Sequence, residues 1–71
     1  MDYADHIKQL QEHAARTAQR ADTLVTQWRD APPGARDYAA GQAAHGALLI
    51  ADQAAQELRR AVHTAVIASV N

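Results

Sequence analysis

Small and apolar residues recur at alternating steps of four and three through the first part of the chain. This spacing places them on one side of an α-helix. The series is Tyr3, Ile7, Leu10, Ala14, Thr17, Ala21, Leu24 and Trp28. The pattern predicts a helix over about residues 3–30. Asp2 and Asp5 stand at its start, where carboxylates cap free N–H groups and complement the positive end of the helix dipole.

A second series with the same steps runs through the rest of the chain and predicts another helix, over about residues 35–69. Its members are Gly41, Ala44, Leu48, Ala51, Ala55, Leu58, Val62, Ala65 and Ser69. Pro33 suits the first turn of a helix because its fixed φ angle is helical and its missing N–H group is not needed there. Asp37 lies close to the same start.

The segment Ala31-Pro32-Pro33-Gly34 separates the two predicted helices. Proline disfavours helix at the residue before it and glycine favours a turn, so the sequence predicts a turn over residues 31–34. Because the connection is short, the two long helices must run antiparallel and side by side. We therefore expect an all-α, antiparallel two-helix hairpin that forms a single domain over residues 1–71.

A two-helix hairpin of 71 residues has little core, and the chain has no cysteine that would cross-link it. Alanines spaced by seven flank the inner series of the second helix, and larger apolar residues lie outside that series. We expect these residues to contact other copies of the chain in a homo-oligomeric bundle, most simply a dimer of four helices. The alternative is that they are scattered surface residues. The predicted interface consists of Ala47, Leu49, Ile50, Ala54, Ala61, Val66, Ile67 and Val70.

The charge balance limits the choice of partners. Lysine and arginine number 7 against 8 aspartate and glutamate residues, for a net charge of −1, which argues against a nucleic-acid partner. The longest apolar run, over residues 47–51, is far shorter than the ~20 residues of a membrane span. No leader-like segment opens the chain, and we expect a cytoplasmic protein without membrane contact. The excess of arginine over lysine and the high alanine content favour a bacterial or phage source.

Catalytic and metal-binding patterns are weak. His6 and His13 share a helical edge, but the Glu-x-x-His spacing of di-iron bundles is missing. Ser69 is the only serine, and no histidine and acid accompany it in a hydrolase pattern. The glycines match no phosphate-binding loop. We therefore expect no enzymatic activity, no cofactor and no metal.

Residues typical of binding sites gather at the two ends of the predicted hairpin. The turn end holds Trp28, Arg29, Arg36 and Tyr38. Tryptophan, tyrosine and arginine are favoured at binding hot spots, although Trp28 is also suited to close the apolar side of the helix.

The antiparallel arrangement predicts a second cluster at the free end. We expect this cluster to contain Tyr3, His6, Arg59, Arg60 and His63. The alternative is a basic rim that interacts with the acidic first turn.

The two-helix plan resembles that of secreted Trp-x-Gly hairpins, but Arg29 and Asp30 follow Trp28, so the glycine of that motif is missing. Phage proteins that sequester cyclic-nucleotide immune signals are similar in architecture only. The sequence favours a non-enzymatic binding protein, a small accessory or regulatory protein that self-associates and engages a protein partner. The alternative is a binder of a small anionic molecule, such as a nucleotide, held between subunits.

Overall fold

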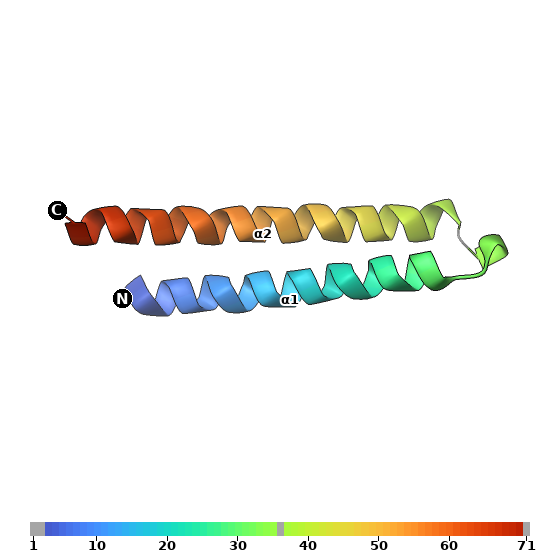
Figure 1. The fold of residues 1–71 in the computed structure, drawn as a ribbon, viewed down its shortest axis with the longest axis horizontal. Helices are drawn as coiled ribbons and strands as arrows, with labels where there is room; N and C mark the ends of the chain where they lie inside the picture. The colour runs from blue at the N-terminus through green and yellow to red at the C-terminus, as the bar shows by residue number, and fades with distance from the viewer. Residues whose placement is uncertain (1–2, 36, 71) are drawn as a thin grey trace.

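The computed structural model describes residues 3–35 and 37–70. Helix α1 (Tyr3–Asp30) and helix α2 (Tyr38–Val70) pack side by side and run antiparallel, joined by the short 3-10 helix η1 (Pro33–Ala35) (Figure 1). The hairpin is 57 Å long and 15 Å across. This confirms the predicted all-helical hairpin. The last turns of α2 extend past the start of α1 (Figure 1).

The sequence pattern predicts a start of the second helix at about residue 35, whereas α2 begins three residues later, at Tyr38. Pro33 belongs to η1 instead of to the first turn of α2. Asp37 explains the later start, because its carboxylate oxygen Oδ1 accepts a hydrogen bond of 2.7 Å from the backbone N–H of Ala40. Its backbone carbonyl accepts a bond of 3.2 Å from Gly41. This is the geometry of an N-cap. Asp2, the predicted cap of the first helix, lies outside the described residues.

Replacing Asp37 with alanine is expected to lower the free energy of unfolding by about 1 kcal/mol, the usual cost of losing an N-cap side chain. Urea denaturation followed by circular dichroism at one fixed protein concentration measures the effect. Asp37→Asn serves as the control, because an amide oxygen can still accept the bond from Ala40. Equal destabilisation by both substitutions would contradict a capping role.

The core consists of small side chains. Among the described residues, the buried ones are Ala21, Ala44, Ala47 and Ala54. On α1 the half-buried residues Ile7, Leu10, Ala14, Thr17 and Leu24 lie on the same side as Ala21, which is the side that the sequence pattern predicts. On α2 the inward row consists of residues spaced by three and four that are buried or half-buried. We call this row the hairpin seam: Ala40, Ala44, Ala47, Ala51, Ala54, Leu58, Ala61 and Ala65.

The hairpin seam corrects the prediction that Ala47, Ala54 and Ala61 contact another copy. Ala47 is 7% exposed and Ala54 is 3% exposed, and the carbonyl of Ala61 accepts a hydrogen bond from Tyr3 on α1. Relative to the predicted inner series, α2 is rotated by about 50°, half of one residue's step around a helix. The rotation leaves Leu48 and Val62 of that series 46% and 40% exposed.

Candidate functional site

The turn end contains an aromatic pair. Trp28 from α1 and Tyr38 from α2 line one shallow pocket, together with Asp37, Gly41, Gln42 and His45. The indole lies over Gly41, with Nε1 at 3.5 Å from the position that a Cβ on Gly41 would occupy. Trp28 is 40% exposed and Tyr38 is 82% exposed. The indole therefore packs against α2 with one part and presents the rest to solvent.

Arg29, which was also predicted at the turn end, is not among the described residues that line this pocket. The Nε of Arg29 lies 3.3 Å from the Oδ1 of its neighbour Asp30, in an exposed ion pair. Such pairs contribute about 0–1 kcal/mol. Arg36 lies outside the described residues. Of the described residues in the predicted turn-end cluster, Trp28 and Tyr38 line the pocket and Arg29 does not.

The predicted free-end cluster is divided between two places. The hydroxyl of Tyr3 donates a hydrogen bond of 2.9 Å to the backbone carbonyl of Ala61. The ring of His6 meets the Tyr3 ring edge-on, with the centroids 6.0 Å apart. Arg59, Arg60 and His63 instead line a separate cleft.

That cleft is formed by α2 alone and has a volume of about 740 Å³. Its six lining residues are Leu58, Arg59, Arg60, Val62, His63 and Val66. The cleft is open and largely apolar, and three nitrogen-bearing side chains stand around it. The sequence placed these three residues together correctly, because they lie within two turns of one helix. Tyr3 and His6 do not line this cleft, although the Tyr3 hydroxyl bonds the carbonyl of Ala61, next to Arg60 in the chain.

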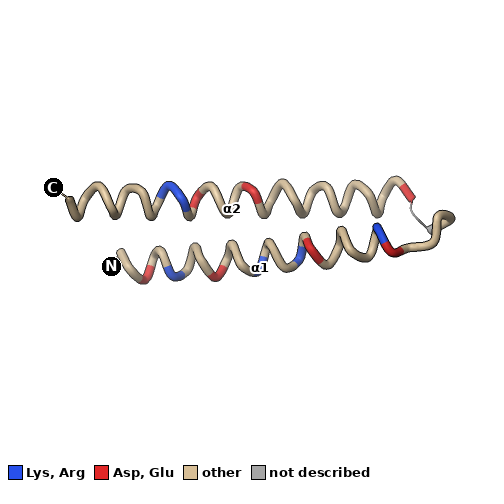
Figure 2. The backbone as a smooth tube through the Cα atoms, in the orientation of Figure 1, with Lys and Arg blue, Asp and Glu red and all other residues tan. Residues whose placement is uncertain are grey.

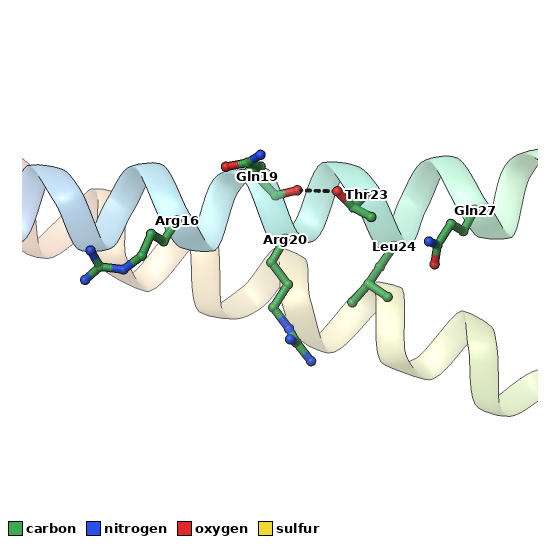
Figure 3. Close-up of a pocket in the computed structure, with 6 residues that line it drawn as sticks. All are labelled: Arg16, Gln19, Arg20, Thr23, Leu24 and Gln27. Carbon is green, nitrogen blue, oxygen red and sulfur yellow. Dashed lines mark hydrogen bonds between the residues drawn. The ribbon is translucent and has the colours of Figure 1, made fainter.

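The structure also contains a polar cleft that the sequence analysis did not select. It follows one edge of α1 and is lined by Arg16, Gln19, Arg20, Thr23, Leu24 and Gln27 (Figure 3). The hydroxyl of Thr23 donates a 3.0 Å bond to the carbonyl of Gln19 (Figure 3). The spacing of Arg16 and Arg20 by four residues, with polar residues around them, was the available sequence pattern.

One broad side of the hairpin is apolar. Val25 of α1 and Leu48 of α2 line a common pocket beside Trp28. Steps of seven and four along α2 continue this side from Leu48 through Ala55 to Val62 and Val66. We call these residues the apolar face: Val25, Leu48, Ala55, Val62 and Val66. Leu48, Val62 and Val66 are 40–54% exposed.

The other apolar residues of the predicted interface are exposed but point in different directions. Leu49 and Ile67 lie on the side of α2 away from the hairpin seam, since successive residues turn by about 100°. Ile50 lies on the side of the seam opposite to the apolar face. Val70 ends α2 and is 80% exposed. Within the predicted interface, Val66 is thus the residue that belongs to the apolar face.

Acidic and basic residues are interspersed along α1, whereas the charged residues of α2 lie between Asp52 and Arg60 (Figure 2). Between residues 3 and 70, the described side chains include no group of three or more histidines, cysteines or carboxylates positioned for a metal ion. In the same part of the chain, neither helix is both long enough and apolar enough to cross a membrane.

Comparison with protein-family models, curated proteins and solved structures found no match to the chain. The function is therefore inferred from the clefts, the aromatic pair and the apolar face themselves.

Proposed function

We propose that the protein is a non-enzymatic binding module, a helical hairpin that self-associates and engages a protein partner. The observation that carries the proposal is the distribution of apolar side chains. Alanines fill the core, whereas the larger residues Leu48, Val62 and Val66 remain about half exposed.

Alanine burial gives limited stability. A buried CH₂-sized group contributes only about 0.8 kcal/mol, so four buried alanines contribute little against the conformational entropy of two long helices. No disulfide adds to this, because the chain has no cysteine. Covering the exposed leucine and valines with another copy is the most direct additional source of stabilisation.

The aromatic pair at the turn end supports binding to a protein partner. Trp28 and Tyr38 present rigid amphipathic rings, and such side chains supply large contact areas at low entropic cost. The pair lies at one tip of a 57 Å hairpin, and its pocket is shallow. A shallow aromatic surface favours a protein side chain or loop over an enclosed small molecule.

The cleft on α2 supports a second candidate function, binding of a small amphipathic anion. Arg59, Arg60 and His63 surround an apolar floor that includes Val62 and Val66. Arginine is suited to carboxylates and phosphates because its guanidinium donates two parallel hydrogen bonds. A second copy of the chain against α2 would enclose this open cleft, and the anion would then lie between subunits.

The proposed function is tested by measuring the mass of the purified protein at micromolar concentration by analytical ultracentrifugation. We expect a mass of at least two chains, with predominantly helical circular dichroism. A folded monomer at this concentration would overturn the proposal of self-association.

Native mass spectrometry of protein isolated gently from its own host then separates the two candidates. A second polypeptide in a fixed ratio to the chain supports the protein partner. A bound anion of small mass supports the second candidate.

A further inference from the structure

On α2 the residues of the apolar face are arranged symmetrically, so that the pattern stays the same when the direction of the helix is reversed. Ala55 lies at the centre of the face on α2. Leu48 and Val62 stand seven residues to either side of it. A two-fold axis through Ala55 would therefore bring Leu48 of each copy against Val62 of the other.

The charges that border the face on α2 match in the same way. Asp52 lies three residues before Ala55 and Arg59 lies four residues after it, so both stand on the same side of α2. On that side Arg59 lines the cleft together with Val62. Turned about the same axis, Asp52 of each copy faces Arg59 of the other. Within the described chain, neither side chain has an ion-pair partner of its own.

Helix α1 shows a second, independent match at the same level of the hairpin. Because Trp28 lies level with Gly41, residues near 14 on α1 lie level with Ala55. Lys8 and Asp22 stand seven residues to either side of Ala15, so these three residues share one side of α1. The same two-fold axis therefore places Lys8 of each copy against Asp22 of the other.

The reverse arrangement is disfavoured by charge. If two hairpins stacked by the same face with α2 on α1, Arg59 would lie level with about residue 10 of α1, half a turn from Lys8. Like charges placed opposite each other are destabilising. The charges thus select the antiparallel stack, in which α2 packs on α2 and α1 on α1.

We propose that the apolar face binds the apolar face of a second copy, antiparallel and about a two-fold axis at Ala55, to form a four-helix bundle. This inference rests on the proposed self-association and names its surface and orientation. The apolar contacts supply the affinity, and the charge pairs fix the register. The alanines at 15 and 55 allow the helices to approach closely at the axis.

Cysteine cross-linking tests the axis, because the natural chain contains no cysteine. A disulfide requires Cα atoms about 4.4–6.8 Å apart, which two facing helices reach only close to the axis. Under mild oxidation, Ala55→Cys is expected to become mainly disulfide-linked dimer. Ile50→Cys, an exposed position on the other side of the same helix, serves as the matched control and is expected to stay mainly uncross-linked.

Charge reversal tests the register. Asp52→Arg and Arg59→Asp should each raise the dimer dissociation constant by about tenfold or more, because each places two like-charged pairs in one interface. The variant that carries both changes should recover most of the natural affinity. Recovery separates a direct pairing of the two residues from a general loss of stability, and circular dichroism verifies that every variant stays helical.

The outcomes distinguish this inference from the proposed function. An oligomeric protein in which Ile50→Cys cross-links and Ala55→Cys does not would overturn the assigned face, while self-association would stand. An oligomer in which the double charge reversal fails to recover affinity would overturn the register. A folded monomer would overturn both proposals.

Discussion

Replacing Ala54 with arginine is expected to destabilise the hairpin by about 3 kcal/mol or more, because the position combines overpacking with burial of an unpaired charge. Ala54 is 3% exposed in the hairpin seam, where a neighbouring helix leaves no room for a long side chain. The arginine can reach solvent only if the helices separate. Thermal unfolding followed by circular dichroism measures the loss.

Ala43→Arg is the matched control for this substitution. Ala43 lies on the same helix and is exposed, so the same change in charge and helix propensity occurs there without burial. The control should alter stability by no more than about 0.5 kcal/mol. If the two variants melt at the same temperature, the seam does not hold the helices together.

Removing the indole at the turn end is the second substitution with a large expected effect. Trp28→Ala should cost about 2–3 kcal/mol, less than a fully buried tryptophan, because part of the ring is already in solvent. Gly41 lets the ring approach α2 closely, so the lost contacts are those across the two helices.

Trp28→Phe and Tyr38→Ala complete this experiment. Phenylalanine keeps an aromatic ring over Gly41 and should recover about half of the loss. Tyr38 is almost fully exposed, so its replacement should leave stability nearly unchanged. Both variants are measured by the same melting experiment. A Trp28→Ala protein as stable as the natural one would mean that the indole serves binding alone and does not pack in the hairpin.

The sequence predicts the side of α1 that faces its partner helix because only one series of small and apolar residues is present there. On α2 two such series are present. They share every second member, and at the other positions they differ by one residue along the chain. One contains Leu48 and Val62, and the other contains Ala47 and Ala54. Hydrophobicity favours the first series, but close packing against the small residues Ala14, Thr17 and Ala21 of α1 favours the second. Shape complementarity between two helices is not visible in either helix alone.

The same distinction, between features of one helix and the packing of two helices, applies to the candidate sites. Residues within two turns of one helix, such as Arg59 and His63, can be grouped from their spacing. Groups that combine both helices depend on how each helix is rotated about its axis. The sequence therefore did not show that Tyr3 bonds the carbonyl of Ala61 while Arg59 and His63 line a cleft that Tyr3 does not line. The start of α2 differs from the predicted start for a local reason. The carboxylate of Asp37 caps the helix, and this cap favours a helix start more strongly than Pro33 does as a first-turn residue.

Because of the hairpin seam, folding and the proposed recognition depend on two different sets of side chains. Small residues set how the chain folds back on itself, and under the proposed function the larger residues outside the seam determine what it recognises. A substitution at Leu48 or Val66 is therefore expected to alter the proposed recognition with little effect on folding of the monomer. If the proposed function holds, such a scaffold can exchange one partner for another, including a diverged copy of itself, by changes confined to its outer surface.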